Sequence, residues 1–201
     1  MDLTDYIETN PIIAAVRNMG DLKSALLSTV RAVFLLTGDV NMVGEAVRLA
    51  HRSDKGIYLH LDLLEGLGRD KAAVHFLAQE VQPDGIITTR SHLALAAKSV
   101  GLYTIQRIFI LDSLSIKTGV ASVQATQPDA VECLPGILPC VFGDLTKQLE
   151  LPIIAGGLLE YPDEMQAVLN AGVKAVSVSK KSFWNLFQNK EEFFKSYRIP
   201  L

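Results

Sequence analysis

Two short segments near the end of the chain carry residues suited to binding a phosphate group. The first, Pro152–Gly157, is an apolar run that ends in two glycines, and the second, Ala175–Lys180, contains two serines and a lysine. Glycine lets backbone N–H groups approach phosphate oxygens closely, and serine hydroxyls donate hydrogen bonds without bulk. The candidate phosphate ligands are Gly156, Gly157, Ser177, Ser179 and Lys180. A tight turn is the alternative interpretation of the two glycines.

Polar residues also interrupt an apolar run earlier in the chain. Side chains in a strand alternate between two faces, so His60 and Asp62 share a face with Tyr58 while the aliphatic residues of Ile57–Leu61 share the other. We expect the aliphatic face to pack on helices and the polar face to bind the polar groups of a small ligand. For His60, a neutral imidazole hydrogen-bonded within the core is the alternative.

Two further runs place charged residues among apolar ones. Gln106 and Arg107 are adjacent in Tyr103–Ile110, so one of them must face inward by alternation, and Glu132 lies in the run Asp129–Leu134. A buried arginine needs an anionic partner, which Asp62, Glu132 or a bound phosphate could supply. An outward Arg107 paired with a helix carboxylate is the alternative. We take Arg107 and Glu132 as further candidate ligands for polar groups.

Short apolar runs alternate with segments of helical periodicity along the whole chain. The runs are Ile12–Val16, Ala32–Leu36, Ile57–Leu61, Gly85–Thr88, Tyr103–Ile110, Asp129–Leu134, Pro152–Ala155 and Ala175–Val178. This alternation predicts a β/α barrel of the TIM-barrel type, in which the loops after strands seven and eight commonly bind phosphate. The two segments that could bind phosphate follow the seventh and eighth runs.

The length limits how large this barrel can be. With 201 residues and 49% hydrophobic content, the chain can bury one core, so we expect a single domain over residues 1–201. Barrels of this type typically need about 250 residues. We therefore expect a compact barrel with short helices and an irregular or missing strand or helix, and a terminal helix or tail over residues 190–201. An open doubly wound sheet is disfavoured because Val16–Gly20 has no glycine fingerprint.

Composition narrows the classes of function. The formal net charge is −3, whereas proteins that mainly bind nucleic acid usually carry an excess of Lys and Arg. A nucleic-acid role would need a local basic patch, or a composite one built in a homo-oligomer. The first apolar stretch, Pro11–Val16, is far shorter than a membrane span or a signal sequence, so we expect a cytoplasmic protein with no membrane partner.

Searches for metal and catalytic motifs give nothing specific. No Ser/His/Asp, HExxH or P-loop pattern is present, and the four histidines lack metal-ligand spacing. Cys133 and Cys140 have no second pair with which to form a zinc site, and we expect both to be thiols. The sequence therefore predicts neither a metal nor a cofactor, and it assigns no catalytic residue.

Seven phrases resemble one known family, in order and over nearly the whole chain. They are LLTGDV, KGIYLHLDLLEGLGRD, DGIITTR, GLYTIQRIFILDS, PDAVECLPGILP, PIIAGGL and AVSVSKKSFW. They look like the glycerol uptake operon antiterminator regulatory proteins, and the LHLDLLEGL and YTIQRIFILDS blocks are the most specific. Two positions depart from the pattern, because Arg90 and Cys140 stand where that family usually has lysine.

The resemblance implies a regulatory function rather than an enzymatic one. It implies a barrel that binds glycerol 3-phosphate as effector and, in that state, an mRNA leader, so that a transcription terminator does not form. Lys180, Lys181 and Trp184 are then candidate RNA contacts, through phosphate neutralisation and base stacking. For Trp184, packing on the barrel is the alternative interpretation.

Two other functions remain open on the sequence alone. One is an isomerase, lyase or phosphodiesterase acting on a small phosphorylated metabolite, because barrels host many chemistries. Its acid or base would come from His60, Asp62 or Glu132, with Arg107 as an anchor. The other is a ligand-binding scaffold that binds no RNA.

Overall fold

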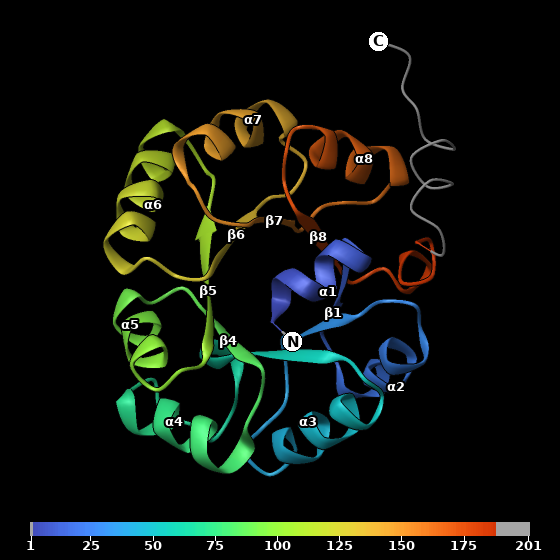
Figure 1. Cartoon of the computed structure of the whole chain (residues 1–201), viewed down its shortest axis with the longest axis vertical. Coiled ribbons are helices and arrows are strands. Elements are labelled where there is room, and N and C mark those ends of the chain that lie inside the picture. Colours follow the sequence, from blue (N-terminus) through green and yellow to red (C-terminus); the bar gives the residue numbers. More distant parts are fainter. Residues whose placement is uncertain (1, 188–201) are drawn as a thin grey trace.

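Eight parallel strands, paired in sequence order, close into a barrel (Figure 1). The structure, a computed structural model, describes residues 2–187, so the predicted terminal helix or tail at 190–201 lies outside the described residues. The strands are β1 (Ile12–Val16), β2 (Ala32–Leu35), β3 (Gly56–His60), β4 (Gly85–Thr88), β5 (Tyr103–Phe109), β6 (Ala130–Leu134), β7 (Ile153–Gly156) and β8 (Ala175–Val178). The predicted barrel is thus confirmed.

Short helices explain how the barrel closes in so few residues. The helices are α1 (Leu3–Thr9), α2 (Met19–Leu27), α3 (Val43–Arg52), α4 (Lys71–Phe76), α5 (Ser91–Ser99), α6 (Ser113–Thr126), α7 (Pro139–Gln148) and α8 (Pro162–Asn170), with single turns η1 (Leu61–Leu63), η2 (Leu77–Val81) and η3 (Lys181–Phe183). Of the expected irregular or missing strand or helix, no strand is missing, because all eight predicted runs form paired strands. Within the described residues, the irregularity lies after β8, where a 3-10 turn replaces a full helix.

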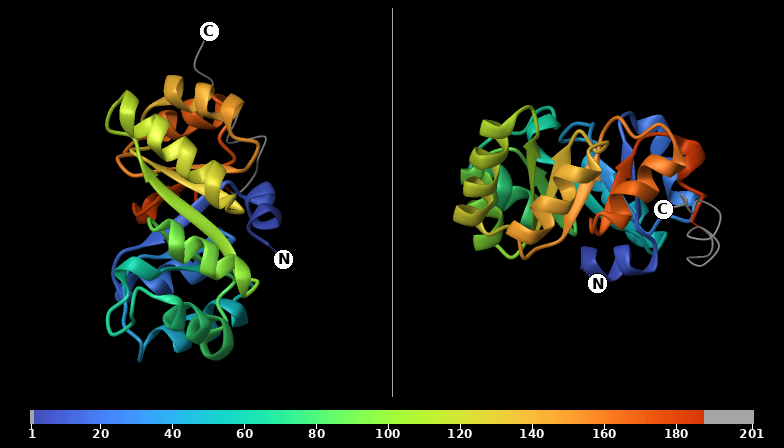
Figure 2. Two further views of the ribbon diagram at one scale, coloured as in Figure 1. Left: turned by 90° about the vertical axis from the view of Figure 1, so that its left-hand side faces the viewer. Right: turned by 90° about the horizontal axis from the view of Figure 1, so that it is seen from above.

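Helices α2 to α8 surround the strands (Figure 1, Figure 2). Their apolar residues recur at helical spacing, as on α3, where Val43, Ala46, Val47 and Ala50 are all buried. These side chains pack on the outward-facing residues of the strands and form the larger hydrophobic cluster. None of the helices within residues 2–187 is long and apolar enough to cross a membrane.

A second hydrophobic cluster fills the lower part of the barrel. Its members are Leu3, Ile7, Ile13, Ala32, Phe34, Tyr58, Ile87, Ile105, Ala130, Ile154 and Ala175. The strand residues among them point inward by the two-residue alternation of a strand. The Tyr58 ring stands edge-on to the Phe34 and Tyr103 rings, with centroids 5.8 Å from each. The lumen is therefore packed at its amino-terminal end.

Helix α1 covers this packed end of the barrel, and the sequence did not predict it. It lies across the barrel in the view down its axis and beneath it in the side view (Figure 1, Figure 2). A capping box formed by Asp2 and Asp5 starts the helix, and Leu3 and Ile7 pack into the lumen cluster. The Asn10 side chain then bonds the Ile12 N–H, at 2.9 Å, where the chain enters β1.

We expect the α1 contact to contribute measurably to folding. Leu3 is fully buried, so Leu3→Ala should lower the free energy of unfolding by about 2–5 kcal/mol through lost burial and a residual cavity. Leu27→Ala is the matched control, because Leu27 is 78% exposed and its truncation should change stability by less than about 0.5 kcal/mol. Urea titration compares them, and equal effects would contradict the packing of α1.

Candidate ligand-binding site

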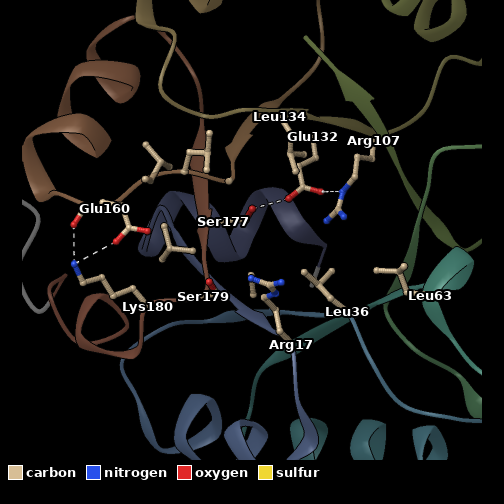
Figure 3. A pocket seen from close by; sticks show the side chains of 15 residues that line it. Arg17, Leu36, Leu63, Arg107, Glu132, Leu134, Glu160, Ser177, Ser179 and Lys180 are labelled. Atoms are coloured by element: carbon tan, nitrogen blue, oxygen red, sulfur yellow. Dashed lines mark hydrogen bonds and ion pairs between the residues drawn. The ribbon is translucent and has the colours of Figure 1, made fainter. Parts of the chain in front are cut away.

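A cavity of about 550 Å³ opens at the carboxyl ends of the strands (Figure 3). Its walls combine cationic, anionic and apolar side chains. They come from Ala15, Arg17, Leu36, Leu63, Arg107, Glu132, Leu134, Gly157, Leu158, Leu159, Glu160, Ser177, Val178, Ser179 and Lys180. Because α1 and the lower cluster fill the other end of the lumen, this cavity is the upper end of the barrel interior.

Three residues of the loops after β7 and β8 that line this cavity have backbone N–H groups without a hydrogen bond in the described part of the chain. Among the described residues, the amides of Gly157, Ser179 and Lys180 donate no hydrogen bond to protein atoms. Gly157 adopts a φ of +77°, a conformation that suits glycine, and Leu158 follows with a φ of +61°. Free amides and a serine hydroxyl are donors for the oxygens of an anion.

Two cationic side chains accompany these donors. Arg17, directly after β1, lines the cavity and forms no ion pair with any residue in 2–187. The Lys180 ammonium instead donates to the Glu160 carbonyl at 2.8 Å and lies 3.6 Å from its carboxylate and 4.8 Å from the Phe183 ring centroid. Lys180 is thus held against the β7–α8 loop, while the Arg17 guanidinium is available to a ligand.

A buried ion pair forms one wall of the cavity. Arg107 Nε donates to Glu132 Oε2 at 2.7 Å, and Ser177 Oγ donates to Glu132 Oε1 at 2.6 Å (Figure 3). Glu132 is 1% exposed and Arg107 is 8% exposed. Of the two alternatives for β5, Arg107 faces inward, whereas Gln106 faces outward and donates to Ser122 on α6. The Nη groups of Arg107 have no partner among the described residues.

Gly156 makes room for the side chains of Glu132 and Ser177 and is not part of the cavity wall. It does not line the cavity, and a Cβ at this position would lie 2.6 Å from Ser177 Oγ and 2.8 Å from Glu132 Oε1. Such distances are far inside van der Waals contact, so any larger residue would displace the Ser177–Glu132 hydrogen bond. The structure therefore explains the glycine at position 156 by the space that the Ser177–Glu132 hydrogen bond needs, and not by the predicted approach to phosphate.

His60 is the last residue of β3, and its side chain is buried, with the residue 2% exposed. Burial, and secondarily the positive charge of Arg107, lower the pKa of His60 to about 4. Its Nδ1 is buried without a hydrogen-bond partner in the described part of the chain. The imidazole is therefore neutral at pH 7, and it does not line the cavity.

Asp62 lies outside the cavity as well. It follows β3 in the turn η1, and its carboxylate accepts the Thr89 N–H at 2.7 Å and the hydroxyls of Thr88 and Thr89. Arg90 Nε lies 3.2 Å from the same carboxylate. These bonds tie the end of β3 to the loop after β4, so Asp62 does not line the cavity with Arg107, Glu132 and Ser177.

The predicted RNA contacts fall in different surroundings. Trp184 is 1% exposed and its indole N–H donates to the Val178 carbonyl at 2.8 Å, so base stacking on it was a wrong prediction and the packed alternative holds. Lys181 pairs with Asp21, and that hydrogen bond lowers the pKa of the Asp21 carboxyl. The Lys181 side chain remains about half exposed.

Sequence reasoning missed several cavity residues. Glu160 lies in a loop, where no periodic pattern marks a cavity residue. Leu158 has a left-handed backbone conformation, which a leucine in a sequence does not indicate. The predicted state of the two cysteines is confirmed, with both free, Cys133 buried and Cys140 exposed. Within residues 2–187 no cluster of three or more His, Cys, Asp or Glu side chains is arranged to hold a metal ion.

The fold and cavity define a class of protein: a closed β/α barrel with a partly cationic ligand cavity at the carboxyl ends of its strands. The chain belongs to the glycerol-3-phosphate responsive antiterminator family, whose sequence model matches residues 12–184. The family expected from the seven phrases is thereby confirmed.

Three relatives show how far the similarity extends. A glycerol uptake operon antiterminator regulatory protein from Listeria monocytogenes str. 4b F2365 has 38% identity and a TM-score of 0.84, covering 87% of this chain and 95% of its own. A related protein from Thermotoga maritima MSB8 has 30% identity and a TM-score of 0.77, covering 86% and 96%. The uncharacterized protein YgcP of Escherichia coli (strain K12) is 34% identical, over 92% of this chain and 97% of its own.

The buried His60 predicts a pH dependence of stability. Its pKa in the unfolded chain is about 6.5, so between pH 6.5 and 4 the unfolded chain takes up a proton that the folded protein does not. The unfolding free energy should therefore fall as the pH falls through this range, by up to about 1.4 kcal/mol per pH unit. Urea titrations of wild type and His60→Gln measure the difference in slope.

His75→Gln is the matched control for this measurement, because His75 is an exposed histidine on α4. It should keep the wild-type slope. If His60→Gln also keeps that slope, His60 takes up its proton in the folded state as readily as in the unfolded chain.

Proposed function

We propose that this protein is a glycerol 3-phosphate-responsive regulator that binds an mRNA leader and causes antitermination of glycerol-uptake genes. One observation carries the ligand part of the proposal. The loops after β7 and β8 supply free amides from Gly157, Ser179 and Lys180 to a cavity that also holds the unpaired guanidinium of Arg17. Family membership gives the anion its proposed identity.

The proposed ligand position uses both ends of the cavity. The phosphate is bound by the loop amides, the Ser179 hydroxyl and Arg17, because these are donors and a cation without protein acceptors. The glycerol hydroxyls lie towards Ser177, Glu132 and the Nη groups of Arg107. Asp62 and His60 do not line the cavity, so we leave both out of the proposed ligand shell.

For the ligand to control RNA binding, it must bind one conformation more tightly than another. Lys180 offers a means, since its ammonium is held by Glu160 in this structure and a phosphate at the loop amides would compete for it. We propose Lys180 and Lys181 as RNA contacts in the liganded state. One copy carries a net charge of −3, so we propose that the RNA groove is assembled from more than one copy in the cytoplasm.

We propose a regulator rather than an enzyme because the buried carboxylate is poorly placed as a base. Both oxygens of Glu132 already accept hydrogen bonds, from Arg107 and Ser177. Turnover of glycerophosphodiesters or triose phosphates by the purified protein, with or without added divalent metal, would overturn this part of the proposal.

Isothermal titration with glycerol 3-phosphate tests the ligand. Wild type should bind it, and Arg17→Gln should weaken binding at least about tenfold because a charge-assisted hydrogen bond to phosphate is lost. Arg48→Gln is the control, since Arg48 lies on α3, 62% exposed and paired with Glu45, and should leave affinity unchanged. If millimolar glycerol 3-phosphate produces no heat of binding and no thermal shift, the proposal is refuted.

A gel-shift assay with a terminator-bearing leader RNA tests the partner. The wild-type protein should shift the RNA in the presence of glycerol 3-phosphate and much less without it. Lys181→Ala should weaken the shift by about three- to tenfold while leaving ligand affinity unchanged, because one phosphate contact is removed. Ligand binding without any ligand-dependent shift would instead indicate a binding scaffold.

A further inference from the structure

The two ends of the cavity differ in charge. At one end, Arg17 and the loop amides present positive charge and N–H donors with no protein acceptor among the described residues. At the other, the Arg107 guanidinium is neutralised by Glu132 within 2.7 Å. Figure 3 shows the Arg17 side chain and the Arg107–Glu132 pair on different sides of the cavity, with Ser177 near the Glu132 carboxylate. Only one end is therefore suited to a full negative charge.

Glu132 lies in a place where solvent screens charge little. Its side chain is 1% exposed, and Arg107 Nε and Ser177 Oγ each donate to one of its oxygens. A second carboxylate brought against it would meet repulsion that a buried environment weakens much less than water does.

An uncharged hydroxyl suits the same place. A hydroxyl both donates and accepts, so it can donate to a free lone pair of Glu132 and accept from an Nη group of Arg107. Neither contact removes the existing Arg107–Glu132 bond. A carboxylate has only acceptors, so it could use Arg107 but would leave its repulsion with Glu132 uncompensated.

The distances allow one small ligand to reach both ends. Ser177 and Ser179 lie two residues apart along the chain, a separation of roughly 7 Å in an extended strand. A phosphate at the Ser179 amide and a three-carbon chain span about that length. The group at the far end of such a chain then lies against Ser177 and Glu132.

We propose, on the basis of the function proposed above, that Glu132 is a specificity-determining residue. It restricts the cavity to phosphate esters whose remaining polar groups are uncharged hydroxyls, and it excludes esters that carry a carboxylate at the far end. Gly156 is needed to keep Glu132 in this position, because a side chain there would displace Ser177 Oγ and Glu132 Oε1.

A matched pair of ligands tests this directly. Glycerol 3-phosphate and 3-phosphoglycerate share the phosphate and the three-carbon chain, and differ in a terminal hydroxymethyl group against a carboxylate. In isothermal titration, wild type should bind glycerol 3-phosphate at least about tenfold more tightly. Glu132→Gln keeps the shape but removes the charge, so 3-phosphoglycerate should bind it more tightly and the ratio of affinities should fall below about threefold.

Glu160→Gln is the matched control, because Glu160 also lines the cavity but its side chain is 68% exposed. It should leave the affinity ratio within about twofold of wild type, since an exposed charge is screened. If Glu132→Gln does not fold, as judged by circular dichroism, the double variant Arg107→Gln/Glu132→Gln leaves no buried charge unpaired. It should also lower the affinity ratio, but less than Glu132→Gln alone, because it removes the attraction of Arg107 together with the repulsion of Glu132.

The outcomes separate the two proposals. If wild type binds neither ligand, the proposed function fails together with this inference. If wild type binds glycerol 3-phosphate but binds 3-phosphoglycerate within about threefold of it, the function stands and the role of Glu132 is overturned. Retained discrimination in a folded Glu132→Gln or double variant overturns that role as well.

Discussion

The buried hydrogen bond between Arg107 and Glu132 constrains most of the upper half of the barrel. The two residues are direct neighbours across β5 and β6, so the parallel register alone brings their side chains to the same level of the lumen. Neither charge is stable there without the other, because an unpaired buried charge costs several kcal/mol. Ser177 extends the arrangement to β8. A single carboxylate thus links side chains from β5, β6 and β8.

This constraint accounts for neighbouring features that otherwise have no common cause. Gly156 on β7 must lack a side chain because the Ser177–Glu132 contact fills the space beside it. The charge of Arg107 helps to keep His60 neutral on β3. Below them the lumen is filled mainly by apolar side chains such as Phe34, Ile105 and Ile154. The barrel interior therefore has two parts. The polar part around Glu132 lines the cavity, and the mainly apolar part beneath it stabilises the fold.

Sequence alone was sufficient for the strands, because each is a short apolar run bounded by turn residues. It also placed Gly157, Ser179 and Lys180 in the last two loops, whereas Gly156 and Ser177 lie within β7 and β8. It failed at Asp62, because the two-residue alternation continued past Leu61 where the chain in fact turns into η1. It assigned Gly156 to the phosphate because the sequence does not distinguish a glycine that makes room for a neighbouring side chain from one that makes room for a ligand. Whether Arg107 faces inward depended on strand register, which alternation leaves open.

Helix α1 also escaped prediction, since seven residues with an acidic start carry little periodic signal. Its position has a kinetic consequence. With the amino-terminal end of the lumen closed by Leu3 and Ile7, a ligand in the cavity has one route of entry and the same route of departure. Any macromolecule resting over the mouth then slows the escape of the ligand beneath it. The residence time of a ligand in the cavity would therefore lengthen while the mouth is covered.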